Sequence, residues 1–342
     1  MKQTAAIIST PLWLPEGDET EDLSVEAEER KLLVPVDLHG DRVDRALALL
    51  VPEFSRSYLQ QLLECGLVRV NDQPCEKASR KVKAADALVV TLRPTQQSQA
   101  FQPQDIAFEV VHQDEHVLVV DKPAGLVVHP APGNWSGTLL NGLLAFDKRS
   151  AGMPRAGIVH RLDKDTSGLM VVARTRQAMD ALVNAIAARE VSRQYLALGS
   201  RHWVGNSTVT VDHPIGRDPR NRLRMAVVDL QKSPGKTART DVHLLDNAKD
   251  CCLVRCVLHT GRTHQIRVHM ASLGHPLLGD QVYGGPTDAG ILRQALHAFR
   301  LAFNHPVTGN RLSFESHLSA DFREALAARS LRYNLSGGLA SP

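Results

Sequence analysis

A polar stretch rich in Gln, Pro and Ser, Thr95 to Gln104, divides this 342-residue chain into two regions with different hydrophobic patterns. Before it, apolar residues recur at helical spacing and then alternate in short runs. From Ile106 onward the pattern is that of strands mixed with a few helices. A chain of this length suffices for about two domains. The sequence therefore predicts an α+β protein with a small and a larger domain, and it excludes a coiled coil or a wholly disordered chain.

We predict five segments along the chain. The first 35 residues mix Pro, acids and Ser without a sustained apolar period, which is typical of a disordered acidic tail. A small module at 36–93, a linker at 94–106, a large domain at 107–330 and a C-terminal tail at 331–342 follow.

The small module is predicted to contain two helices and two strands. Apolar residues from Val43 to Leu50 mark one helical face, and a second helix begins at Ser55 or Ser57 and ends at Gly66. Short strands follow at 67–70 and 87–92. Basic side chains near the second helix and the turn, among them Arg56 and Lys81, are suited to phosphate contacts.

The net charge of +3 conceals an uneven distribution. Residues 1–31 carry eight acidic and three basic residues, so the rest of the chain carries 37 basic against 29 acidic residues. A basic body suggests an anionic partner, although a merely solvated surface is an equal alternative. Arg217, Arg220, Arg222 and Arg224 form the densest basic loop, which suits RNA phosphates but also suits solvent.

Compartment and membrane association are constrained by what the sequence lacks. No apolar run approaches the roughly 20 residues that a membrane span needs, and the N-terminus does not resemble a signal peptide. Five cysteines without regular spacing are expected to be reduced, so we expect a cytoplasmic protein.

The first candidate site is the charged loop from Gly157 to Gly168, which leads directly into an apolar strand. Asp163 lies between Arg161 and Lys164, and cations this close would keep a carboxylate ionised, as a nucleophile must be. The alternative is a solvated turn with a capping Asp.

The second candidate site runs from His259 to His269 and opens a predicted helix that Thr260 or Thr263 caps. Arg262 could clamp a carboxylate or a phosphate, whereas Arg267 and His269 are expected to face solvent. Three histidines near Cys251, Cys252 and Cys256 suggest zinc. The spacing is poor for a metal site, since adjacent cysteines in a strand point to opposite faces.

Several of these segments together resemble the RluA family of RNA pseudouridine synthases. The residues that carry the resemblance are VLVVDKPAGLVVHP at 117–130, HRLDKDTSGLMVVA at 160–173, Arg-Gln-Tyr at 193–195, HTGRTHQIRVH at 259–269 and LLGDQVYGG at 277–285. The small module is similar to an S4 RNA-binding domain through SRSYLQQLLECGLVRVND. The resemblance implies a mixed, largely antiparallel sheet with flanking helices, crossed by the active cleft.

The resemblance also implies residue roles. Asp163 would be the catalytic aspartate, Arg262 would pair with it, Tyr195 would stack on the target base, and Arg161 would help displace the flipped uridine. His160 and Thr166 would contact substrate with Arg217, Arg222, Arg56 and Lys81.

The substrate implied by the resemblance is 23S ribosomal RNA or the assembling large ribosomal subunit, with the modified uridines in the helix 69 stem-loop. We expect a monomer that needs no metal and no cofactor. A non-catalytic RNA-binding ribosome assembly factor on the same fold is the alternative. Such a protein would be expected to have lost Asp163, Tyr195 or Arg262, and this chain has all three.

Overall fold

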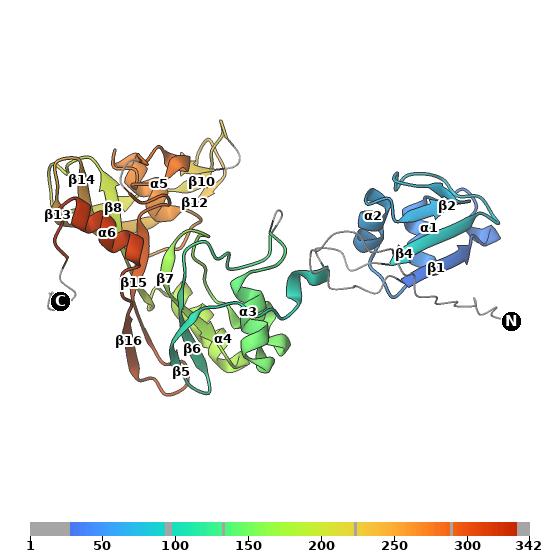
Figure 1. The fold of residues 1–342 in the computed structure, drawn as a ribbon, viewed down its shortest axis with the longest axis horizontal. Helices are drawn as coiled ribbons and strands as arrows, with labels where there is room; N and C mark the ends of the chain where they lie inside the picture. Colours follow the sequence, from blue (N-terminus) through green and yellow to red (C-terminus); the bar gives the residue numbers. More distant parts are fainter. Residues whose placement is uncertain (1–27, 93–97, 132–133, 222–223, 288–289, 334–342) are drawn as a thin grey trace, which may run out of the picture. The chain divides into compact units, whose positions relative to one another are not determined.

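The computed structural model describes residues 28–92, 98–131, 134–221, 224–287 and 290–333. The chain forms two compact units, which divide between Ala100 and Phe101, inside the segment predicted as a linker. Figure 1 shows the helices and strands of the two units.

The small unit is a four-stranded sheet with two helices packed against it. The sheet has the order β1 (Glu28–Leu33), β4 (Ala87–Leu92), β2 (Val68–Val70) and β3 (Gln73–Pro74). The helices are α1 (Val43–Leu50) and α2 (Arg56–Glu64), and leucines from both enter the core. Ser55 caps α2 by accepting a hydrogen bond from the Tyr58 amide at 3.3 Å.

Strand β1 corrects the prediction that the first 35 residues form a tail. Glu28–Leu33 pair with β4 over their whole length, in antiparallel register. The strand carries charged residues at four of its six positions, so no apolar pattern predicted it. Leu32 nevertheless packs against the core of the small unit. Residues 1–27 lie outside the described residues.

The large unit is built on a nine-stranded sheet, which confirms the mixed and largely antiparallel fold. Its order is β5, β6, β7, β15, β8, β14, β13 and β9, with β16 paired to β15. The β7–β15 pair is parallel, and the other pairs that the structure describes in this sheet are antiparallel. The bounds are β5 (Glu109–Gln113), β6 (Val117–Lys122), β7 (Ser167–Ala173), β8 (Ser192–Ser200), β9 (Thr208–Asp212), β13 (Arg239–Asn247), β14 (Cys251–Leu258), β15 (Leu296–Asn304) and β16 (Arg311–Glu315).

Both faces of this sheet are covered by other parts of the chain. Successive residues of its central strands point to opposite faces and are apolar, so each face has side chains to bury. Leu118 and Val120 pack on one face with α3 (Leu139–Phe146) and the buried residues of α5 (Gln265–Ser272). On the other face, α4 (Arg176–Ala187) and α6 (Ala320–Ala328) cover the two ends of the sheet. The site described below therefore rests on strands that are fixed from both sides.

The C-terminal boundary lies later than predicted. Leu331 is buried and Tyr333 packs against the same cluster as α6, so 331–333 belong to the large unit and not to a tail. Residues 334–342 lie outside the described residues.

A second, three-stranded sheet projects from the large unit. It has the order β11 (Met225–Val227), β10 (Ile215–Arg217) and β12 (Gly235–Lys236). Short 3-10 helices complete the structure at Val36–Leu38, Ser98–Phe101, Lys148–Gly152, Pro154–Gly157 and Gln281–Tyr283.

The cysteines of β14 do not form a metal site. Cys251 packs into the cluster under α6, whereas Cys252 and Cys256 pack on the opposite face, as their spacing predicted. Within the described ranges, no three His, Cys, Asp or Glu side chains are placed to hold a metal ion. None of the helices in those ranges combines the length and hydrophobicity that a membrane span requires.

Candidate active site

Asp163 lies on a loop that the surrounding structure holds in place. The loop leads into β7, where Gly168 allows the backbone to approach β15 closely, since a Cβ there would lie 2.3 Å from the Ala298 carbonyl oxygen. On the other side, the buried Lys122 ammonium donates to the carbonyl of Lys164 at 2.9 Å, and also to those of Pro123 and Leu126. Burial lowers the pKa of Lys122 to about 7, and the charge of Asp165 opposes this effect. Three carbonyl acceptors match the three hydrogens of an ammonium group.

Arg267 of α5 is the cation that holds Asp163. Its Nη1 donates to Asp163 Oδ2 at 3.2 Å, while Nε and Nη2 donate to the two carboxylate oxygens of Asp280 at 2.7 and 2.9 Å. The Arg267 side chain is 6% exposed and that of Asp280 is 1% exposed. Burial alone would lower the pKa of Arg267, but Asp280 and then Asp163 outweigh it and raise the pKa. The guanidinium is therefore a permanent positive charge between two carboxylates.

His264 approaches Asp163 from another direction. The Tyr283 hydroxyl accepts a hydrogen bond from the Met225 amide at 3.1 Å, so its own proton is available to His264 Nδ1 at 2.9 Å. His264 Nε2 lies 4.0 Å from Asp163 Oδ1. Burial lowers the pKa of His264, and the charge of Asp163 opposes the shift.

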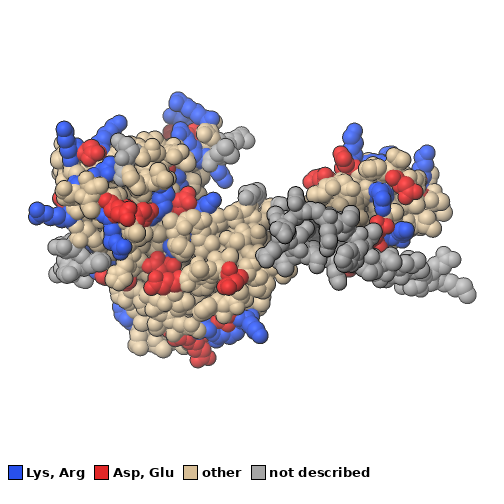
Figure 2. All heavy atoms as spheres, in the orientation of Figure 1, with Lys and Arg blue, Asp and Glu red and all other residues tan. Residues whose placement is uncertain are grey.

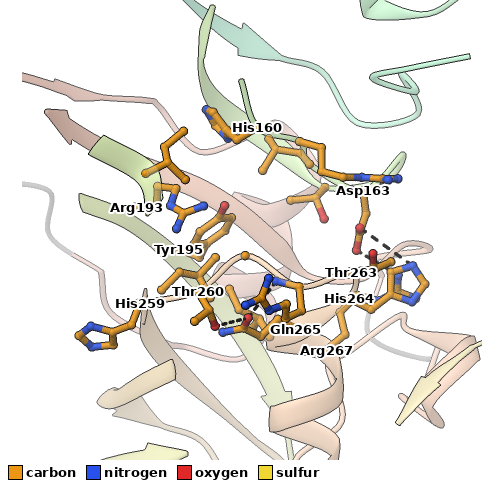
Figure 3. A pocket seen from close by; sticks show the side chains of 18 of the residues that line it. His160, Asp163, Arg193, Tyr195, His259, Thr260, Thr263, His264, Gln265 and Arg267 are labelled. Atoms are coloured by element: carbon orange, nitrogen blue, oxygen red, sulfur yellow. Dashed lines mark hydrogen bonds and ion pairs between the residues drawn. The ribbon is translucent and has the colours of Figure 1, made fainter. Parts of the chain in front are cut away.

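Asp163 and Tyr195 line one hollow of about 340 Å³ (Figure 3). Tyr195 comes from β8 and is 5% exposed, and burial raises the pKa of its hydroxyl to about 12. The ring is therefore neutral at physiological pH. A planar aromatic face and a carboxylate are thus presented to the same space.

The structure corrects two predictions in the 259–269 segment. Arg262 does not pair with Asp163; its Nε donates to the Thr237 carbonyl at 3.0 Å, although the residue lines the hollow. Arg267 and His269, expected to face solvent, are 5% and 0% exposed. The reason is that α5 is buried on all sides over Gln265 to Met270, so it has no solvent face for its polar residues.

The predicted caps of α5 also differ. The N-cap is His264 in the left-handed region, with φ of 56°, and neither Thr260 nor Thr263 holds that position. Instead the Gln265 side chain accepts from the Thr260 hydroxyl at 2.7 Å and from the Arg262 amide at 3.0 Å. The turn before α5 is thus closed by a side chain within the helix.

The remaining residues predicted near Asp163 all line the hollow. Arg161 is exposed at its rim, whereas Thr166 is 1% exposed and accepts from Gln294 at 3.3 Å. His160 Nε2 accepts from the Val171 amide at 3.1 Å, and burial together with the charge of Arg193 lowers its pKa to about 3. A neutral His160 is therefore fixed in orientation by β7.

The predicted RNA contacts outside the hollow differ in their surroundings. Arg217 is exposed on β10, and Lys and Arg side chains gather at the end of the large unit that carries β10 and β12 (Figure 2). Arg222 lies outside the described residues. In the small unit, Lys81 is exposed.

Arg56 has a structural partner in the small unit. It donates to the fully buried Asp44 at 2.8 Å, and Arg42 and Gln60 donate to the same carboxylate. Burial raises the pKa of Asp44, but the hydrogen bonds of Arg42, Arg56 and Gln60 outweigh it and hold the pKa well below its usual value. Because the Arg56 side chain is also 51% exposed, it can reach a phosphate while it keeps this ion pair.

Arg193 lies in a segment that carries the resemblance, but no role in the site was predicted for it from the sequence. It lines the hollow, is 6% exposed, and packs against Gly261, where a Cβ would lie 2.9 Å from Arg193 Nη1. The glycine in the 259–269 motif was the available signal, because glycine often marks the close approach of another group.

Comparisons with known proteins agree with this fold. A family model described as RNA pseudouridylate synthase matches residues 116–272, and one described as S4 domain matches residues 41–88. The chain belongs to the RNA pseudouridylate synthase family, and it is an enzyme of that class with an S4 domain at its N-terminal side.

Among curated relatives, the chain is similar to proteins named ribosomal large subunit pseudouridine synthase D. It is 46% identical over 325 residues to that of Neisseria meningitidis serogroup B, covering 91% of this chain and 84% of the relative. It is 41% identical over 300 residues to that of Escherichia coli strain K12, covering 84% and 90%.

Solved structures give the same fold. Human RNA pseudouridylate synthase domain containing 4 aligns with a TM-score of 0.54 and 25% identity, covering 66% of this chain and 94% of that one. Human RNA pseudouridylate synthase domain containing 1 aligns with a TM-score of 0.51 and 28% identity, covering 63% and 85%.

Proposed function

We propose that this chain isomerises specific uridines of 23S ribosomal RNA to pseudouridine, with Asp163 as the group that reacts with the nucleotide. The names of relatives that are 46% and 41% identical to it support the choice of ribosomal RNA. The observation that carries the role of Asp163 is its position: an aspartate held by the buried Arg267 on the wall of a hollow that Tyr195 also lines.

The reaction suits a site built from such residues. Uridine loses its N1–C1′ bond, the uracil turns, and C5 bonds to C1′; the proton leaves C5 and N1 gains one. There is no net redox change, hydrolysis or group donor. The Asp163 carboxylate could attack C1′ or C6, or it could remove a proton from the ribose so that the base departs, and in each case a charged carboxylate is the reactive form.

The uracil must leave the RNA stack before it can turn, at a cost of a few kcal/mol. The neutral ring of Tyr195 offers it a stacking surface inside the hollow, and a neutral phenol can exchange a proton with the base. Arg161, exposed at the rim, can occupy the space that the uridine leaves or contact its phosphate.

Within the 23S RNA we propose the helix 69 stem-loop as the target, modified in the cytoplasm by a monomer on free RNA or on the assembling large subunit. The S4 domain and the basic end of the large unit would supply phosphate contacts. A chain that lacks residues 1–93 should bind RNA more weakly and still modify a short stem-loop. Loss of all catalysis on that stem-loop would contradict this division of labour.

The central test is to map pseudouridines in ribosomal RNA from cells without this gene, complemented with wild type or with Asp163→Asn. We expect the variant to leave the target uridines unmodified and to bind the stem-loop with nearly wild-type affinity. Asp180→Asn is the matched control, because Asp180 is a 58% exposed carboxylate on α4. Normal modification by Asp163→Asn would refute the assignment, and unchanged modification without the gene would favour the assembly-factor alternative.

A further inference from the structure

A second hollow, of about 470 Å³, opens beside the active-site hollow. We call it the flanking pocket. It shares Val159, His160 and Arg161 with the active-site hollow, so an occupant of one lies next to an occupant of the other. Its other lining residues are Phe101, His129, Pro130, Leu140, Arg155 and Ile158.

One wall of the flanking pocket is a strained turn. Arg155, Ala156 and Gly157 are consecutive residues in the left-handed region, with φ of 53°, 52° and 83°. A left-handed conformation is strained for a residue that has a Cβ. The turn is held by packing, since Gly157 approaches the Ala173 carbonyl so closely that a Cβ would lie 1.9 Å from its oxygen. Such strain is concentrated at functional sites. Here the turn fixes the backbone from which the Arg155 side chain extends.

The flanking pocket is positively charged and has no acidic lining residue among the residues described. Within the described part of the chain, the side chains of Arg155 and Arg161 make no hydrogen bond or ion pair, so both guanidiniums can receive an anion. Burial, and then the charges of Arg155 and Arg161, lower the pKa of His129 to about 4. His129 is therefore neutral at pH 7 and does not add charge.

Phe101 gives the flanking pocket an aromatic surface. Its side chain is 66% exposed, which is unusual for a large apolar residue. The residues after it are anchored, because Asn141 of α3 donates to the Gln102 carbonyl at 2.8 Å and its own carbonyl accepts from the Gln104 amide at 3.1 Å. The aromatic ring thus projects from a backbone that is tied to the large unit.

We propose that the flanking pocket binds a nucleotide of the same RNA strand close to the target uridine. Its base stacks on Phe101, and its phosphate lies between the guanidiniums of Arg155 and Arg161. Stacking surfaces combined with unpaired cations are how proteins hold single-stranded nucleic acid. This inference rests on the proposed RNA substrate, and it assigns the enzyme a contact with a second unpaired nucleotide besides the one that reacts.

The test compares the full chain with Phe101→Ala and Arg155→Gln on a stem-loop RNA that contains the mapped target uridine. Affinity for the RNA is measured by direct binding, and the rate is measured by single-turnover pseudouridine formation. The RNA is prepared intact and with one abasic nucleotide at each of the three positions on either side of the target. Arg176→Gln is the control, since the Arg176 side chain is 69% exposed and lines neither hollow.

We expect Phe101→Ala to weaken binding of intact RNA roughly 5- to 150-fold, the range for loss of one base–aromatic stack. At one flanking position, removal of the base should weaken binding to the wild-type chain as much as Phe101→Ala weakens binding of intact RNA. At that same position, Phe101→Ala should bind abasic and intact RNA with equal affinity. Arg155→Gln should weaken binding at every flanking sequence, whereas Arg176→Gln should stay within about twofold of wild type.

Wild-type affinity of both variants for intact RNA would overturn the proposal. It would also be overturned if Phe101→Ala weakened the binding of every abasic RNA by the same factor. Thermal melting of each variant shows whether the fold is intact. Failure of the proposed function is distinguishable, because the wild-type chain would then form no pseudouridine in any of the RNAs.

Discussion

Replacing Arg267 by Met tests whether one guanidinium supports both the fold and the reaction. Met has a similar length and no hydrogen-bond donor, so the substitution leaves Asp280, which is 1% exposed, as a buried carboxylate without its partner. Removing one partner of a buried ion pair costs about 3–5 kcal/mol. For a unit of this size each kcal/mol lowers Tm by roughly 2–4 °C, so we expect a decrease of about 6–20 °C.

The same substitution should slow pseudouridine formation, because Asp163 loses the cation that contacts it at 3.2 Å. We expect a decrease of about 100-fold or more in the single-turnover rate, comparable to the loss of one preorganised electrostatic contact. Stability is measured by calorimetry and by chemical denaturation, and the rate is measured with the stem-loop RNA at saturating protein.

A double variant separates the two roles. Adding Asp280→Asn to Arg267→Met removes the unpaired buried charge, so at least half of the lost stability should return. The rate should not return, since Asp163 still lacks its cation. A single variant that melts or reacts like wild type, or a double variant no more stable than Arg267→Met, would refute the reasoning.

Three other predictions follow from the geometry of the two units. Tyr195→Phe should keep RNA affinity within about twofold of wild type, because the aromatic ring remains. The pH–rate profiles of variant and wild type should have the same shape from pH 6 to 10, because burial raises the Tyr195 pKa to about 12. A change of slope in this range that is seen only in the wild-type profile would contradict this. Tyr283→Phe removes the hydrogen bond to His264 and should lower kcat about 2- to 13-fold with KM unchanged, in steady-state assays. Asp44→Asn should destabilise the small unit by about 1.5–3 kcal/mol near pH 7 in calorimetry. The folded-state pKa of Asp44 is depressed, so the carboxylate stabilises the fold above its unfolded pKa near 4, and this stabilisation disappears as the pH falls. The free energies of unfolding of wild type and variant should therefore converge in acid. A difference that stays constant with pH would count against the prediction.

Much of the fold could be predicted because a continuous apolar run marks a strand that is buried on both faces. Val117 to Val120 read as a buried strand, and β6 indeed contributes alternate residues to clusters on both faces of the sheet. Strand β1 could not be predicted in this way, since four of its six residues are charged and it joins the sheet by backbone pairing with β4.

The candidate site was predictable where chemistry and local sequence coincide, as in the Asp163 loop. The partner of Asp163 was not, because Arg267 lies 104 residues away and reaches it only through the fold. The usual expectation that charged helix residues face solvent fails for α5, which is buried on all sides. Asp280, 13 residues beyond Arg267, supplies the charge that makes such a buried guanidinium stable.

The burial of the cysteines has a practical consequence for studies in solution. Cys75, Cys251, Cys252 and Cys256 are buried, so a reagent has little access to them. Burial also raises the pKa of Cys251 to about 11 and that of Cys252 to about 12, so the thiolates of these two residues are scarce at neutral pH. Cys65, at the C-terminal end of α2, is exposed. A maleimide dye should therefore attach at one position, in the S4 domain, and the wild-type chain can report RNA arrival there by fluorescence without any cysteine being removed.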